Sequence, residues 1–261
     1  MALLIGLAAV VAAAAAVRST WSPCGISMLS TITPMAERSR GRRWWLTAAW
    51  FVLGAVLGGA TLGLIAVLGA VVVDVTGTGD SAVPLAVAAV VTFVTASMDL
   101  GIGTAMPHHR RQVDEVWLDQ YRSWVYGLGF GWQIGSGLTT YIMTAAVYAT
   151  VVLAALTASV PVAMGIAVFF GLIRGLAIGL GARLTNPDRL RRFHHRFDEL
   201  GPSVRAAVIS VQLVVATTAG AAVWGPVGGG CIAVAGIVAV LWRRRMVQRN
   251  PVPQVALVVD T

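Results

Sequence analysis

Long apolar runs separated by short arginine-rich segments are the feature that most constrains the fold of this chain. Seventeen of the nineteen basic residues lie in four polar segments, residues 38–43, 110–122, 183–205 and 243–249. The other two, Arg18 and Arg174, lie inside apolar runs. Cytoplasmic loops of membrane proteins carry an excess of arginine and lysine, so the pattern predicts that all four segments face the cytoplasm.

The composition is that of an integral membrane protein. Of 261 residues, 57% are hydrophobic and only 11% are charged, and the mean hydropathy is +0.79. A net charge of +8 would suggest nucleic-acid binding in a soluble protein. Here the arginines flank apolar runs, and we interpret them as determinants of topology and as contacts for lipid headgroups. We therefore expect membrane lipid, and no nucleic acid, as a partner.

Seven apolar runs can be compared with the roughly 20 residues that a spanning helix needs. They are residues 2–35, 44–73, 83–106, 124–156, 160–182, 206–223 and a shorter run at 231–242. Seven crossings that start outside place every arginine-rich segment, and the C-terminus, in the cytoplasm. Six crossings are the alternative, because the last two runs are short and rich in glycine. The sequence therefore predicts an all-α protein of the cell membrane with six to seven transmembrane helices and an external N-terminus.

The two halves of the chain resemble each other weakly. Trp21 and Trp132 both precede an interruption rich in small polar residues. The next runs contain glycines at small-xxx-small spacing, which lets helices approach closely, namely Gly54, Gly58, Gly59, Gly63, Gly171, Gly175 and Gly179. Three spans per half put the halves in opposite orientations, as in inverted-repeat transporters and carriers.

We therefore predict a single transmembrane domain with four parts. Repeat one covers residues 1–106 and repeat two covers residues 123–223. An extra C-terminal helix follows at residues 228–245, and residues 250–261 are expected to form a disordered tail.

The tripeptide Ser22-Pro23-Cys24 predicts a break in the first span. Proline removes a backbone donor and clashes with the preceding turn, and a break at membrane depth must line a cavity or be buried in protein. The three residues would then take the N-cap and the first two positions of a new half-helix. The helix dipole, with Arg18 adding to it, would stabilise the Cys24 thiolate and make it a better nucleophile. The alternative is a small apolar side chain beside a tolerated kink.

The stretch from Trp21 to Pro34, the basic segment after it, and the span from Trp44 with the sequence FVLGAVLGG resemble the CcdA/DsbD-type transmembrane thiol–disulfide carriers of cytochrome c biogenesis. The resemblance covers the first six runs, about residues 1–223. In that family, a Ser-Pro-Cys element in the first span and a Pro-Cys element in the fourth supply a redox cysteine pair within inverted three-helix repeats. It implies that Cys24 is the first redox cysteine and that thioredoxin-like proteins are partners.

The second redox cysteine of that family is missing here. The similarity around Trp21 and Trp132 aligns Cys24 with Gly135, so Gly135 and Ser136 mark the expected second interruption and cavity. A dithiol carrier needs two thiols within reach of each other. Cys231, the only other cysteine, lies near the outer end of the last run and could pair with Cys24 only if the first break opens outward. The alternative is that Cys231 is structural.

Asp99 and Arg174 are the remaining charges inside apolar runs. Both runs cross inward in the predicted topology, and both residues lie at a comparable distance from the next arginine-rich segment, so we predict an ion pair. Ionisable residues within the bilayer usually face the bundle interior, paired, at functional positions. The alternative is a pair that only holds the two spans together.

The segment 184–200, LTNPDRLRRFHHRFDEL, predicts a cytoplasmic amphipathic helix capped by Asn186 and Pro187. The adjacent His194 and His195 would point to different faces of that helix, so a metal site would need ligands from elsewhere, such as His108 and His109. We prefer a solvated helix that faces the headgroups. Neither a metal nor a cofactor is predicted.

Three classes of function remain open. The first is a membrane thiol–disulfide oxidoreductase with Cys24 as its retained redox group. The second is a small-solute or ion transporter that holds its substrate near residues 22–30 and 135–140, with Asp99 and Arg174 gating or coupling. The third is a non-catalytic membrane partner of another envelope protein. The sequence contains no P-loop, HExxH or nucleophile-elbow motif, which argues against a conventional soluble enzyme.

Overall fold

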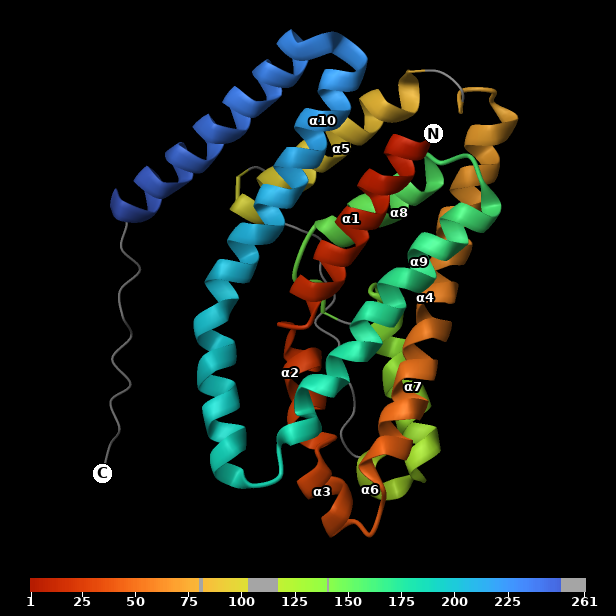
Figure 1. Cartoon of the computed structure of the whole chain (residues 1–261), viewed down its shortest axis with the longest axis vertical. Helices are drawn as coiled ribbons and strands as arrows, with labels where there is room; N and C mark the ends of the chain where they lie inside the picture. Colours follow the sequence, from red (N-terminus) through yellow and green to blue (C-terminus); the bar gives the residue numbers. More distant parts are fainter. Residues whose placement is uncertain (80–81, 103–116, 140, 250–261) are drawn as a thin grey trace.

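The computed structural model describes residues 1–79, 82–102, 117–139 and 141–249, and every regular element within them is a helix (Figure 1). Five helical segments in this part of the chain are long and apolar enough to cross a membrane. They are α1 (Ala2–Ser19), α4 (Trp44–Val75), α5 (Val83–Leu100), α9 (Val160–Leu176) with the 3-10 helix η1 (Ala177–Arg183), and α10 (Pro187–Arg249). Leucine and valine side chains on their outer surfaces are exposed, as lipid contact requires. The predicted all-α class is confirmed, and the five apolar segments agree with a membrane protein.

Two of the predicted spans are broken. The first run forms α1 and α2 (Pro23–Thr31), followed by the short α3 (Pro34–Ser39). The fourth run, after the single turn α6 (Trp117–Gln120), forms α7 (Ser123–Ser136) and α8 (Ala146–Ala155). Gly137 ends α7 with a φ of 69°, a left-handed conformation that glycine adopts without steric cost. The break in the first run agrees with the prediction, and α7 ends at Ser136, where the second interruption was expected.

Helix α10 differs from the sequence-based expectation. The predicted amphipathic segment is not a separate helix, because α10 continues from Pro187 through Gly201 and Pro202 into the predicted sixth run. Its predicted cap is confirmed, since the Arg189 N–H donates to the Asn186 side chain at 2.8 Å. The helix turns back on itself only at Gly225, where φ is 71°, and its second part descends beside the first (Figure 1). The predicted tail and the end of the third run lie outside the described residues.

Small residues bring α4 into backbone contact with α7 and α9. A Cβ added to Gly131 or Gly135 of α7 would overlap the backbone of Phe51 or Ala55, and one added to Gly171 of α9 would overlap Ala55. Six of the seven predicted glycines lie at close contacts of α4 with α7 or α9, namely Gly54, Gly58, Gly59, Gly63, Gly171 and Gly175. At Gly63 the neighbouring atoms belong to the side chains of Met164 and Ala167. The prediction is wrong for Gly179, which has open space around it. These contacts make α4 the central helix of the bundle.

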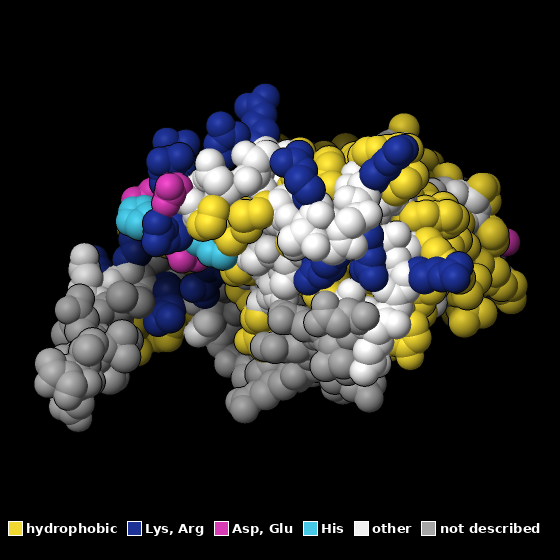
Figure 2. Space-filling model, turned by 90° about the horizontal axis from the view of Figure 1, so that it is seen from below, with side chains coloured by type: hydrophobic (Ala, Val, Ile, Leu, Met, Phe, Trp, Pro, Cys, Tyr) yellow, Lys and Arg dark blue, Asp and Glu magenta, His cyan; other side chains and the backbone are white. Residues whose placement is uncertain are grey.

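Basic side chains gather at one end of the molecule. Figure 2 looks onto the end where α3 and the first turns of α10 lie, and arginines stand around that face. Residues 40–43 connect α3 to α4, and residues 184–186 connect η1 to the first turns of α10. The common location of these two arginine-rich segments agrees with the prediction that they share one side.

Candidate functional site at the broken first span

The break between α1 and α2 is a compact, capped turn. The Ser22 Oγ accepts a hydrogen bond from the Gly25 N–H at 3.1 Å, Pro23 is the first helical residue, and Cys24 is the second. Gly25 lies so close to the Thr20 carbonyl that a Cβ would overlap it. The predicted positions of Ser22, Pro23 and Cys24 at the start of a half-helix are therefore confirmed.

Trp21 connects this break to α10 through a hydrogen bond and a ring contact. Its indole N–H donates to the Phe197 carbonyl oxygen at 2.7 Å, and the two rings stack with centroids 4.2 Å apart. One helical turn away, His194 shares a 2.7 Å hydrogen bond with Ser30 of α2. His195 instead lies 3.2 Å from Glu199. Among the described residues, no group of three or more His, Cys, Asp or Glu could hold a metal ion; His108 and His109 lie outside that part of the chain.

Arg174 of α9 is the charged group at the break. Its side chain is only 3% exposed, and its guanidinium lies over the Phe170 ring, 5.7 Å from the centroid. One amino group donates to the Ser19 carbonyl at 3.5 Å, while Nε has no hydrogen-bond partner. Arg174 lines a cavity of about 20 Å³ with Gly25 and Met28, which has room for about one water molecule. A buried cation with an unused donor therefore faces the start of α2.

Cys24 lies beside this cation. The thiol is 1% exposed and is close enough to Arg174 for the two groups to interact electrostatically. Arg18, which was expected to support the thiol, lines a different cavity together with Arg205. Arg174 is therefore the cation that the structure places at Cys24.

The predicted ion pair between Asp99 and Arg174 is wrong. The Asp99 carboxylate accepts hydrogen bonds from Thr144 Oγ1 at 2.5 Å, the Ala145 N–H at 2.7 Å and Gln212 Nε2 at 2.8 Å. It therefore neutralises the positive N-terminal end of the half-helix α8. Arg174 lies instead at the half-helix α2.

The two half-helices thus begin in opposite electrostatic surroundings. At α8, the carboxylate of Asp99 balances the helix dipole, whereas at α2 the cation Arg174 adds to it. No acidic residue is among the described residues that line the cavity at α2. The site therefore favours an anionic group, and the ionisable acid beside it is the thiol of Cys24. It can support a nucleophilic thiolate or hold a small anion.

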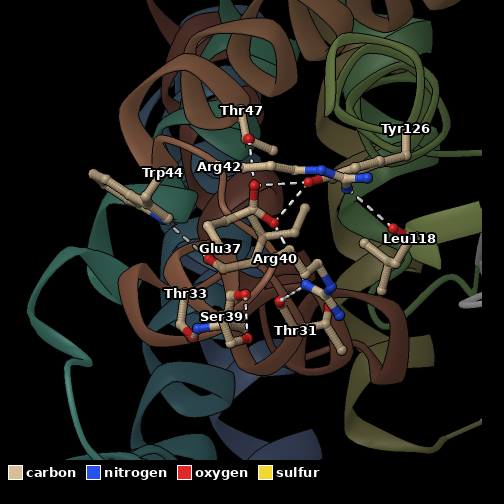
Figure 3. A network of polar contacts seen from close by, with 12 residues as sticks. Thr31, Thr33, Glu37, Ser39, Arg40, Arg42, Trp44, Thr47, Leu118 and Tyr126 are labelled. Carbon is tan, nitrogen blue, oxygen red and sulfur yellow. Dashed lines mark hydrogen bonds and ion pairs between the residues drawn. The ribbon is translucent and has the colours of Figure 1, made fainter. Parts of the chain in front are cut away.

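A second buried charge, Glu37 of α3, was not recognised in the sequence. Its carboxylate is fully buried and accepts hydrogen bonds from Tyr126 at 2.6 and 2.7 Å and from Thr47 at 2.6 Å, with Arg40 at 3.4 Å (Figure 3). Arg42 covers the Tyr126 ring at 5.3 Å and donates to the Leu118 carbonyl. The network joins α3 to the first turns of α4 and α7, and its role is structural.

One sequence signal could have indicated Glu37. Thr33 and Pro34 repeat the cap-and-proline pair of Ser22 and Pro23, so a helical turn was foreseeable there. Glu37, in the first turn of that helix, is the first acidic residue of the chain and directly precedes the arginine-rich segment 38–43. Its partners come from distant parts of the chain, which the sequence does not bring together.

Comparison with known proteins identifies the family. The methylamine utilization protein MauF of Methylophilus methylotrophus is 31% identical over 208 residues, which cover 75% of this chain and 69% of the relative. MauF of Methylobacillus flagellatus is 30% identical over 233 residues, which cover 81% of this chain and 77% of the relative. The chain belongs to the MauF family. MauF of Paracoccus versutus, 29% identical over 214 residues, covers 80% of this chain and 76% of its own length. No family model and no solved structure matches the chain.

In this MauF-family chain, Gly135 is not the structural counterpart of Cys24. Cys24 follows the first break as the second residue of α2, but Gly135 lies in the last turn of α7, before the second break. The second position of α8 is held by Val147. Ser136 bonds locally, to the Gln133 carbonyl at 2.8 Å and to Thr139 at 2.6 Å. The weak repeat in the sequence therefore gave the wrong register.

The two cysteines form no disulfide. Cys24 packs in a cluster with Met28, Ile32 and Phe51, whereas Cys231 is exposed on the second part of α10. Since the chain has two cysteines, the site at α2 holds a single thiol.

Proposed function

We propose that this chain is a multi-pass membrane accessory protein of methylamine utilization that acts through the thiol of Cys24. The names of its MauF relatives support the pathway. One observation carries the chemistry: Cys24 begins a buried half-helix beside the cation Arg174, with no carboxylate among the described residues that line the cavity. The resemblance to CcdA/DsbD carriers supports the same site.

The packing supports an inverted repeat as the scaffold of this site. The broken pair α1 and α2 would correspond to α7 and α8, α4 to α9, and α5 to the first part of α10. Under this correspondence, the contact of α4 with α7 is matched by that of α9 with α1. Six crossings follow, and the second part of α10 supplies a seventh. The arginine distribution supports an external N-terminus and a cytoplasmic C-terminus in the cell membrane.

The proposed chemistry is thiol–disulfide exchange with a partner protein. The thiolate of Cys24 attacks one sulfur of a partner disulfide, forming a mixed disulfide and releasing the other sulfur as a thiolate. A thiolate of a thioredoxin-like protein then attacks the mixed disulfide, and Cys24 leaves as a thiolate. Arg174 and the start of α2 stabilise that charge in both steps. Because Cys24 is buried, the site must open to admit the partner.

Growth on methylamine tests the proposal. In cells that encode this chain, we expect Cys24→Ala to abolish growth on methylamine as fully as deletion of the gene, because the reacting sulfur is lost. Cys231→Ala is the matched control and should grow normally, since that thiol is exposed and far along the chain from the site. Immunoblots of membranes and growth without methylamine control for expression and viability. Normal growth of the Cys24→Ala strain would refute the thiol mechanism.

Passage of a small anion is the second candidate, and the unpartnered Nε of Arg174 in a buried cavity favours it. On this alternative, Cys24→Ala grows normally and Arg174→Met does not. If both strains grow and only the deletion fails, the chain acts as a non-catalytic membrane partner.

A further inference from the structure

A second basic cavity lies on the other side of the first span. It has a volume of about 570 Å³ and is lined by three arginines from different parts of the chain: Arg18 of α1, Arg205 in the first part of α10, and Arg243 in the second. We propose that this cavity binds a phosphate group, carried by an anionic phospholipid or free in solution. The site is separate from Cys24 and Arg174 and does not depend on the thiol mechanism.

Two of the arginines are held in place by the end of α5. Arg205 Nε donates to the Asp99 carbonyl oxygen at 3.1 Å, and Arg243 Nε donates to the Leu100 carbonyl oxygen at 2.8 Å. These carbonyls lie in the last turn of the helix and have no partners within it. A guanidinium has five N–H donors, so capping leaves donors on both side chains for another acceptor. These hydrogen bonds thus hold Arg205 and Arg243 at the cavity and leave some of their N–H donors available.

The side chain of Arg18 is not held by a contact of this kind. Arg18 is half-buried in the last turn of α1, and its side chain has no hydrogen bond or ion pair with any residue that the structure describes. It lies close enough to Arg205 for the two positive charges to repel each other. A charged side chain within an apolar run is costly unless it is paired. An anion between these arginines would remove both costs.

The acidic groups nearby do not supply that anion. Asp99 attracts Arg18, but its carboxylate is already hydrogen-bonded to Thr144, Ala145 and Gln212. Asp198 is the one carboxylate among the described lining residues, against three arginines. The cavity therefore has an excess of positive charge.

The chemistry of the lining matches a phosphate group with an attached apolar chain. Arginine binds phosphate through paired N–H donors, and basic pockets between transmembrane helices bind anionic headgroups. The remaining walls include Leu100, Met143 and Ile209, which can contact an acyl chain. Apolar walls favour the lipid as the source of the phosphate.

The test uses the full chain purified in a neutral detergent and freed of anionic lipid. Native mass spectrometry measures binding of phosphatidylglycerol, phosphatidylcholine and inorganic phosphate to the wild type and to Arg18→Gln. Because the Arg18 side chain makes no hydrogen bond to any described residue, this variant should fold normally, which its thermal unfolding checks. The matched control is Arg244→Gln, which removes an exposed arginine that lines another groove.

We expect the wild type and Arg244→Gln to prefer phosphatidylglycerol to phosphatidylcholine by at least about tenfold, which is about 1.4 kcal/mol, and Arg18→Gln to lose this preference. If inorganic phosphate binds instead and Arg18→Gln abolishes its binding, the site is confirmed with free phosphate as its ligand. The proposal is overturned if the wild type neither prefers phosphatidylglycerol to phosphatidylcholine nor binds inorganic phosphate. It is also overturned if Arg18→Gln keeps the wild-type preference.

Discussion

Replacing Gly135 with cysteine should destabilise the protein by about 3 kcal/mol or more and should yield no disulfide with Cys24. If Gly135 were the counterpart of Cys24, the same substitution would restore the dithiol motif and form a disulfide. The added Cβ would overlap the backbone of Ala55, and backbone atoms of a packed helix cannot move aside as a flexible side chain can. Thermal unfolding in detergent, with non-reducing gels of the same samples, measures both outcomes.

Gly165 provides the matched control for that substitution. It lies in α9, and no atom outside its own helical turn lies within 4 Å of the position that an added Cβ would take. Gly165→Ala should therefore be neutral or stabilise the helix by up to about 1 kcal/mol. Gly135→Ala should be destabilising. A Gly135→Cys protein with wild-type stability and a bond to Cys24 would disprove the close contact of α4 with α7.

Loss of the buried carboxylate of Glu37 should destabilise the protein by about as much as Gly135→Cys. Glu37→Ala would leave the hydroxyls of Tyr126 and Thr47 without their acceptor and Arg40 without its ion pair, in a fully buried site. Removing one member of a buried charged network costs about 3–5 kcal/mol. We expect a corresponding decrease in the free energy of unfolding, measured in detergent by denaturant titration.

The exposed Glu199 serves as the control, and Glu199→Ala should change stability by less than about 0.5 kcal/mol. Tyr126→Phe tests the network independently, because its effect should largely disappear when Glu37 is already alanine. Additive effects of the two substitutions would show that the hydrogen bonds of Figure 3 do not stabilise the fold.

Local signals predicted local structure well. Ser22 and Pro23 specify a cap and a first helical position with their own side chains, so the break before Cys24 could be predicted without knowledge of the rest of the fold. Glycines at regular spacing in the runs around Gly58 and Gly171 likewise indicated close helix packing, because the spacing within one helix is enough to predict it. Both features depend on residues within one or two turns.

Features that depend on distant residues could not be predicted. The positions of Asp99 and Arg174 along their runs did not give the direction of their side chains, so the predicted pair was wrong. The second interruption was expected at Gly135 and Ser136, and α7 ends at Ser136. The start of α8 could not be predicted, because it lies where Asp99, from another helix, accepts the Ala145 N–H. The burial of Glu37 likewise depends on Tyr126, far along the chain.

The central claim is that Cys24, beside Arg174, is the working thiol of this MauF-family protein. Its most direct test is a mixed disulfide trapped by acid quenching and alkylation of membranes from cells growing on methylamine. We predict a reducible adduct at Cys24 in the wild type and in Cys231→Ala. Arg174→Met should reduce it about tenfold, which corresponds to about 1.4 kcal/mol, because the cation beside Cys24 is lost. Absence of any adduct at Cys24 in the wild type, or an equal amount in Arg174→Met, would contradict the claim.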